Sequence, residues 1–251
     1  MNYDKLSSFR QTDKMTNLVA QICKKVGRAS VLSRKHRDLT RRLENRIQTI
    51  HASLSIAGYE SDLKEVRDVM NRKYGMDVSK DIMAAQNACD AYDRLYQYKP
   101  TSERDLLQAH DIMMDGLIVE AGRYRSGNVG VIRSGNLVYV APRALLIPGY
   151  MRNLFEWYET SEKHPLIKSA IFHYLFLAIH PFADGNGRMV RLWHRVLLGV
   201  WEESFYSLPL DSILMQRQSA YVDAIGCATC RNNGALFVTF MLEAILSAMS
   251  D

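Results

Sequence analysis

The chain has 251 residues, of which 47% are apolar and 24% charged, so it can bury one large core and disorder is excluded as its default state. Gly and Pro are sparse, at 14 and 6 residues, which favours helices over a β-sandwich or barrel. No run reaches the roughly 18 apolar residues of a membrane span, and the N-terminus lacks the apolar segment of a signal peptide. We therefore expect a mostly α-helical, cytoplasmic protein without a membrane partner.

The first segment, residues 1–45, is predicted to be a basic helical leader in front of a main domain that spans 46–251. The net charge of +5 is concentrated at 24–46, where nine Lys or Arg face two acidic residues. Such a segment could contact nucleic acid, but aromatic residues are not interleaved with the basic ones. A solvated basic helix face is therefore the favoured interpretation, and a nucleic-acid-binding helical module is the alternative.

Several helices are expected in the main domain, after the N-terminal leader. Apolar side chains recur at helical spacing from Leu43 to Leu54, and Gly58 is a natural C-terminal cap, so we predict a helix over 42–57. The next helices are expected over 62–73, 79–97 and 102–120.

Residues 122–142 change in character, because four glycines punctuate two short runs of β-branched residues. The runs at 129–132 and 137–140 flank Arg133-Ser-Gly-Asn136, which predicts a β-hairpin over about 129–140. Two strands are only marginally stable alone, so the hairpin must lie over the helical body. Such a hairpin is often a lid or a substrate clamp.

The second half of the chain is again predicted to be helical. A helix is expected over 148–161, and Pro165 opens another that is apolar on nearly every face and should be the buried central helix. Pro181 ends this helix at His180, because proline cannot continue the hydrogen-bond pattern. The next helix is expected from near Arg188 to about 201, followed by helices over 210–226 and 233–248.

The loop between these two helices carries a candidate phosphate site. Residues 180–191 read His-Pro-Phe-Ala-Asp-Gly-Asn-Gly-Arg-Met-Val-Arg. The run Gly185-Asn186-Gly187 leads directly into a helix, where unpaired backbone N–H groups and the positive end of the helix dipole attract phosphate. Arg188 and Arg191 are three residues apart on that helix, so both guanidinium groups can reach a polyphosphate from one side.

Two further groups of the loop suggest catalysis. Asp184 offers a hard oxygen ligand for the Mg²⁺ that accompanies nucleotide phosphates. His180, at the end of the preceding helix, is suited to act as the general base for a substrate hydroxyl. A rival interpretation is a metal-dependent hydrolase that uses His173, His180 and Asp184. This interpretation has two histidines but no clear third protein ligand, and it leaves the two arginines unexplained.

Taken together, the twelve residues resemble the motif of the Fic family, His-Pro-Phe-x-Asp/Glu-Gly-Asn-Gly-Arg-x-x-Arg, at all nine fixed positions. The Gly-x-Tyr-Arg-x-x-x-Val segment from Gly122 to Val129 and the hairpin after it also look like the Fic core, so the resemblance covers about residues 45–245. It implies an all-α Fic fold, a helical bundle around a central buried helix with a β-hairpin flap. The typical reaction of the family is transfer of AMP from Mg-ATP to a Ser, Thr or Tyr hydroxyl of a protein.

The resemblance also implies roles for individual residues. His180 would deprotonate the target hydroxyl, and Asp184 would hold Mg²⁺. Phe182 would anchor the loop in the core, and Tyr221 lies where the family often places an aromatic residue near adenine. The phosphates would be bound by Gly185, Asn186, Gly187, Arg188 and Arg191, and the target segment would be held by flap residues Ile132, Arg133, Ser134 and Gly135.

A departure from the family pattern occurs in the helix over 42–57. Many Fic proteins carry an inhibitory Ser/Thr-x-x-x-Glu-Gly/Asn, whose glutamate pairs with the second arginine of the motif. Here the segment is Ser53-Leu-Ser-Ile-Ala57-Gly58. An alanine cannot neutralise Arg191, so we expect that arginine to be free for ATP and the enzyme to be de-repressed. An engineered Glu→Ala change is favoured over natural loss, and Glu60 is a conceivable substitute carboxylate.

The resemblance leaves several properties open. The motif indicates phosphate chemistry more firmly than it indicates which nucleobase is bound. A Fic-type transferase of UMP, phosphate or phosphocholine is therefore the main alternative. Removal of AMP is not expected, because relatives that perform it use the missing glutamate. The enzyme itself is a conceivable acceptor of AMP, and a homo-oligomer is a further conceivable assembly.

Overall fold

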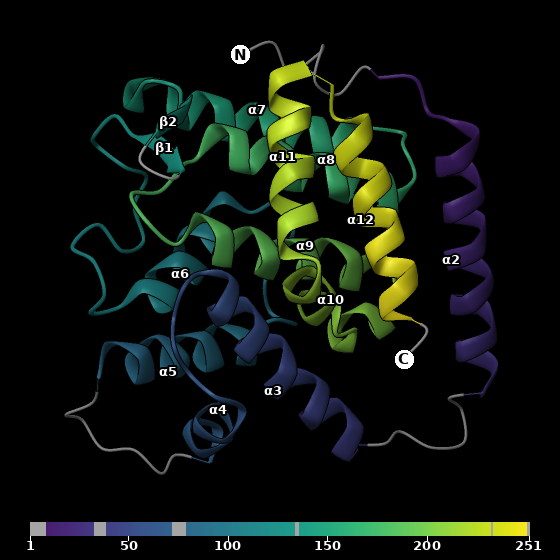
Figure 1. The fold of residues 1–251 in the computed structure, drawn as a ribbon, viewed down its shortest axis with the longest axis horizontal. Coiled ribbons are helices and arrows are strands. Elements are labelled where there is room, and N and C mark those ends of the chain that lie inside the picture. Colours follow the sequence, from purple (N-terminus) through teal and green to yellow (C-terminus); the bar gives the residue numbers. More distant parts are fainter. Residues whose placement is uncertain (1–8, 33–38, 72–78, 134–135, 232, 250–251) are drawn as a thin grey trace.

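The computed structural model describes residues 9–32, 39–71, 79–133, 136–231 and 233–249, and it is an α-helical bundle with one small hairpin (Figure 1). This confirms the predicted all-α fold class. The helices of the N-terminal half are α2 (Asp13–Leu32), α3 (Leu39–Ile56), α4 (Leu63–Met70), α5 (Lys80–Asp93) and α6 (Glu103–Met114). Those of the C-terminal half are α7 (Ile147–Thr160), α8 (Pro165–Ile179), α9 (Asn186–Trp201), α10 (Leu210–Gln216), α11 (Gln218–Arg231) and α12 (Ala235–Ala248), with 3-10 turns η1 (Ala144–Leu146) and η2 (Glu203–Ser207).

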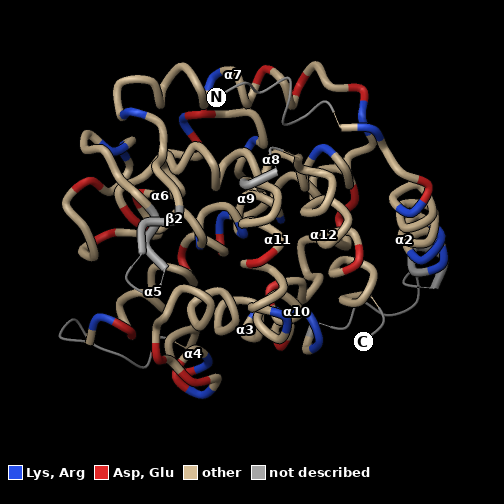
Figure 2. Tube along the Cα trace, turned by 45° about the horizontal axis from the view of Figure 1, so that its top comes forward, with Lys and Arg blue, Asp and Glu red and all other residues tan. Residues whose placement is uncertain are grey.

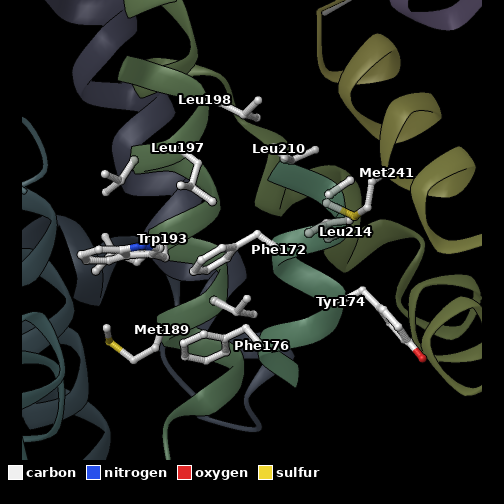
Figure 3. Packing of buried hydrophobic residues seen from close by; sticks show 14 of the residues in the cluster. Phe172, Tyr174, Phe176, Met189, Trp193, Leu197, Leu198, Leu210, Leu214 and Met241 are labelled. Atoms are coloured by element: carbon white, nitrogen blue, oxygen red, sulfur yellow. The ribbon is translucent and has the colours of Figure 1, made fainter. Parts of the chain in front are cut away.

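Helix α8 is the expected central helix. It packs against α7, α9 and α12, and nearly all of its side chains are buried because it is apolar on every face. Phe172 and Phe176 point from α8 toward α9, where they meet Trp193 and Met189 (Figure 3). The helix ends at His180, whose backbone is left-handed with φ 52° and ψ 62° and whose N–H still donates to Phe176 O at 2.9 Å.

The N-terminal leader contributes to the same core. Helix α2 lies alongside α12 and buries Met15 and Ile22 in the main apolar cluster (Figure 1). Its basic side chains Lys24 and Arg28 are exposed to solvent, and Figure 2 shows Lys and Arg on this helix. The division of the chain at residue 45 stays a prediction, and residues 33–38 of the basic segment lie outside the described residues.

The helices differ from the sequence-based expectation most clearly in three places. Helix α6 ends at Met114 instead of 120, because the chain turns at Gly116 with a positive φ of 66°. The helix expected over 210–226 is two helices, α10 and α11, that meet at Arg217. Helix α5 ends at Asp93, short of the expected 97. Helix ends are set by tertiary packing as well as by local propensity, and the break at Arg217 lies within the expected helix.

The predicted hairpin is present. Strands β1 (Gly130–Arg133) and β2 (Asn136–Val140) pair antiparallel, with Gly130 opposite Val140. The Tyr139 hydroxyl donates to Ala178 O at 2.7 Å, which ties the hairpin to the last turn of α8. Ser134 and Gly135, expected in the flap, lie outside the described residues. Among the residues that are described, no helix is long and apolar enough to cross a membrane.

Candidate active site

A cavity of about 540 Å³ lies where five parts of the chain meet. They are the end of α3, the start of α5, the last turns of α8, the loop that opens α9, and α11. The cavity is lined by Ile56, Ala57, Gly58, Tyr59, Lys80, Asp81, Leu177, Asp184, Gly185, Gly187, Arg188, Arg191, Tyr221 and Ile225. The structure therefore brings most of the predicted site residues together. His180, Asn186 and Ser53 border this region without lining the cavity.

The loop before α9 is held together by its own polar groups. Asn186 Oδ1 accepts from Phe182 N and Asn186 Nδ2 donates to Phe182 O, each at 2.9 Å. Phe182 is fully buried and stacks on His110 with ring centroids 3.6 Å apart. Two amide hydrogen bonds within the loop make Asn186 a brace that fixes the start of α9, whereas the sequence predicted only a contact with phosphate.

The two glycines of the loop differ in how strictly they are required. Gly185 has a φ of +79°, and a β-carbon there would lie 2.6 Å from Met114 Sδ, so both the backbone and the neighbour favour glycine. A β-carbon on Gly187 would lie 3.2 Å from Nη1 of Arg191, which would have to move by a few tenths of an ångström.

His110 is a supporting residue that the sequence did not reveal. Gly122 N donates to His110 Nδ1 at 3.0 Å, so the proton of the neutral imidazole is on Nε2, which lies 3.1 Å from Asp184 O and donates to it. Burial lowers the pKa of His110 to about 4, so the ring stays neutral at physiological pH. No local pattern marks His110, because its partners are 12 and 74 residues away.

Arg125 is a second supporting residue, within the Gly122 to Val129 segment. Its Nε donates to His180 O at 2.7 Å, and its Nη2 donates to Pro142 O at 2.6 Å. Its backbone N–H donates to Pro181 O at 3.0 Å. Arg125 therefore joins the base of the hairpin to the turn that carries His180.

His180 itself is half-buried at the end of α8. Burial lowers its pKa below the ordinary value of 6.5, and the charge of Arg125 lowers it further. The imidazole is therefore neutral at neutral pH and can accept a proton.

Arg188 is buried with an incomplete set of partners. Its side chain is 2% exposed, and its guanidinium lies over the Tyr59 ring at 4.7 Å from the centroid. Nη2 is 3.8 Å from Asp184 Oδ2, while Nε and Nη1 have no hydrogen-bond partner within the described part of the chain. Leaving donors of a buried cation unpaired is costly, so an anion at this position would be stabilised.

Arg191 is held more tightly than expected. Ala57 supplies no carboxylate, but Arg191 Nε donates to Ser53 Oγ at 2.9 Å and Nη2 donates to Ser53 O at 2.7 Å. Asp211 Oδ1 lies 3.5 Å from Nε, and this carboxylate also pairs with Arg195 at 2.6 Å. Arg191 is therefore not without protein partners, because Ser53 and Asp211 orient it, but it still lines the cavity, and its availability to ATP stays a prediction.

Tyr221 and His173 form a buried chain. The Tyr221 hydroxyl is 2.7 Å from His173 Nε2, and His173 Nδ1 is 2.9 Å from His194 Nδ1. Tyr221 also lines the cavity, so it is a core residue that reaches the site. Both ring nitrogens of His173 are engaged in this way, which argues against the hydrolase site of His173, His180 and Asp184. Within the described ranges no three His, Cys, Asp or Glu side chains gather to hold a metal ion.

Asp184 fits a more limited role in metal binding. Its side chain is 63% exposed and borders the cavity, and Oδ1 accepts from Gly185 N at 2.6 Å. A single carboxylate suits Mg²⁺, which keeps several waters and takes other oxygens from substrate phosphates. The donor set is therefore adequate for Mg²⁺ that arrives with a nucleotide.

Comparison with known proteins identifies the family. A model of the Fic/DOC family matches residues 100–198. The chain is 32% identical over 162 residues to the protein adenylyltransferase Fic of Drosophila virilis, and this match covers 60% of the chain and 32% of the relative. The corresponding protein of Aedes aegypti is 31% identical over 163 residues. The chain thus spans about a third of the length of these curated relatives.

Solved structures agree. A Fic family protein from Desulfovibrio desulfuricans G20 is 40% identical, with a TM-score of 0.91, and the match covers 96% of this chain and 74% of that one. Fic-1 from C. elegans has a TM-score of 0.71 at 18% identity, which supports the fold alone. With a match of this extent to the Desulfovibrio protein, and the loop geometry above, the chain belongs to the Fic family.

Proposed function

We propose that this protein transfers AMP from ATP to a hydroxyl group of a protein. The observation that carries the proposal is the pair of buried arginines at the N-terminal end of α9. Arg188 has two nitrogens without a hydrogen-bond partner among the described residues, and Arg191 is oriented by Ser53. Both arginines line one cavity with Gly185 and Gly187. This arrangement suits a polyphosphate.

In the proposed reaction His180 accepts the proton of the target hydroxyl. The hydroxyl oxygen then forms a bond to the α-phosphorus of ATP, the bond from that phosphorus to the bridging oxygen of the β-phosphate breaks, and pyrophosphate leaves. The lowered pKa of His180 keeps the imidazole in its proton-accepting form at neutral pH. Arg125, bonded to His180 O, keeps the turn in place.

The other residues position and neutralise the phosphates. The N–H groups at the start of α9 face the α-phosphate, and Arg188 and Arg191 bind the outer ones. Asp184 would hold Mg²⁺, whose charge offsets that of the phosphates. Tyr221 and Ile225 line the remaining wall of the cavity, where an adenine ring would pack.

The hairpin would hold the acceptor. Strands β1 and β2 lie beside the end of α8, so an extended target segment could pair with a strand edge next to His180. The flap residues Ile132 and Arg133 lie in strand β1. The enzyme itself is one conceivable acceptor.

The proposal is tested by incubating the protein with ATP labelled on the α-phosphate and with a lysate. Label is expected on protein, and mass spectrometry should find AMP on Ser, Thr or Tyr. Label from γ-phosphate should not be transferred. In parallel, His180→Ala should lower labelling by at least about 100-fold while ATP binding persists.

The outcomes separate the alternatives within the fold. Transfer from UTP in preference to ATP, or transfer of the γ-phosphate, would replace AMP by UMP or phosphate as the group moved. Full labelling by the His180→Ala variant would remove His180 from the role of base. Absence of nucleotide binding by the unaltered protein would overturn the proposal.

A further inference from the structure

One wall of the cavity is supplied by α5, in a part of the chain outside the residues 100–198 that match the family model. Lys80 and Asp81 are the first two residues of this helix. Ser79 caps it, because Ser79 Oγ accepts from Ile82 N at 3.3 Å. The positive end of the α5 dipole therefore borders the same cavity as the N-terminal end of α9.

Lys80 is exposed and makes no hydrogen bond or ion pair with the described residues. An uncommitted lysine on a surface is common by itself. This one, however, shares its cavity with Arg188, which is 2% exposed and has two nitrogens that no described residue pairs with. The two observations are independent, and both indicate an anion between α5 and α9.

The net charge of the cavity lining depends on Lys80. The lining carries three cations, Lys80, Arg188 and Arg191, and two carboxylates, Asp81 and Asp184, which leaves a net charge of +1. Without Lys80 the lining would be neutral. Because α5 also supplies Asp81, Lys80 offsets that carboxylate and keeps the lining attractive to a polyanion.

We propose that Lys80, at the N-terminal end of α5, is a further phosphate-binding residue that contacts the outer phosphates of ATP. The inference rests on the proposed function, in which the α-phosphate lies at the start of α9 near His180. The outer phosphates then extend across the cavity toward the ends of α3 and α5. Lys80 consequently favours the triphosphate over a monophosphate.

The test is direct binding, measured by isothermal titration calorimetry with a non-hydrolysable ATP analogue and with AMP. Lys80→Gln should bind the analogue roughly three- to tenfold more weakly and AMP with unchanged affinity. The difference should shrink at high salt, because the lysine is exposed. Asp81→Asn, which removes a negative charge from the same wall, should bind the analogue more tightly.

The matched control is Lys64→Gln, which removes a lysine from an exposed position on the neighbouring helix α4. It should bind both nucleotides like the unaltered protein. If Lys80→Gln and Lys64→Gln bind the analogue equally well, the role of Lys80 is excluded while the proposed function stands. If the unaltered protein binds no ATP analogue, the proposed function fails first. Equal weakening for AMP and the analogue would assign Lys80 a structural role and also overturn the inference.

Discussion

Two regions of the cavity differ in how their polar groups are satisfied. We call the loop that opens α9 the floor, and the turn after α3 together with the start of α5 the rim. The floor, residues 182–191, satisfies most of its polar groups internally, through the Asn186 amide and the carbonyl of Asp184 bonded to His110. The rim presents Ala57 and Tyr59 from the turn after α3, and Lys80 from the start of α5. The floor is thus held in shape by its own hydrogen bonds, whereas in the proposed function the rim would influence which anion binds and how tightly.

This contrast has a physical basis. A buried loop must pair its backbone groups within the protein, so the residues that do so are few and closely spaced in sequence. Rim residues meet solvent when the site is empty and can change without unfolding the loop. Substitutions in the rim should therefore alter nucleotide binding, and substitutions in the floor should alter stability as well.

The largest effect of a rim substitution on nucleotide binding is expected when a carboxylate is added there. In Ala57→Glu the new side chain would enter the cavity that Arg188 and Arg191 line, pair with one of them and repel phosphate. ATP binding and AMP transfer should fall by at least about tenfold, a change of about 1.4 kcal/mol, measured by calorimetry and labelling. Ala57→Gln, which has similar volume without charge, is the control. Unchanged activity in Ala57→Glu would contradict the idea that the absence of this glutamate leaves the site active.

Alanine substitutions at one glycine of the floor and one of the rim should lower the free energy of unfolding by different amounts. Gly185 and Gly58 both have positive φ, at +79° and +85°, but only Gly185 has a close neighbour, Met114. Gly58→Ala should cost about 1 kcal/mol of unfolding free energy through backbone strain alone. Gly185→Ala should cost about 1 to 3 kcal/mol more, since the methyl group also overpacks Met114. Denaturant unfolding measures both, and equal costs would indicate that Met114 yields freely.

The smallest effect is expected at the ring that covers Arg188. Tyr59→Leu removes the cation–π contact, which is worth roughly 0.5 to 2 kcal/mol, so ATP affinity should fall a few fold. Tyr59→Phe keeps the ring and should retain most of the affinity. If Tyr59→Phe bound ATP as weakly as Tyr59→Leu, the hydroxyl of Tyr59, and not its ring, would account for the loss of affinity.

Much of the fold could be predicted from local patterns. The apolar helix α8, its end before Pro181 and the hairpin were expected, because helical periodicity, proline geometry and glycine-flanked β-branched runs are short-range signals. The end of α6 and the break at Arg217 were not expected, since each depends on how the chain packs. The loop from His180 to Arg191 was located by its composition, and Asp184, Gly185, Gly187, Arg188 and Arg191 of this loop do line one cavity.

The supporting residues could not be predicted in this way. His110, Arg125 and Asp211 touch the loop or its arginines from 74, 55 and roughly 20 residues away, and single polar residues carry no periodicity. Ser53 was noted only through the family pattern. Its hydrogen bonds to Arg191 depend on how α3 packs against α9, a contact of the folded chain.

The amino-acid sequence by itself determined that this is a helical protein of the Fic family and located its candidate phosphate-binding loop at the start of a helix, because those signals come from residues close together in the chain. Only the tertiary structure decided that Arg191 is oriented by Ser53 and Asp211, that Tyr59 covers Arg188, and that α5 brings Lys80 to the same cavity. These contacts join helices far apart in sequence, and their geometry is set by the packing of the common core.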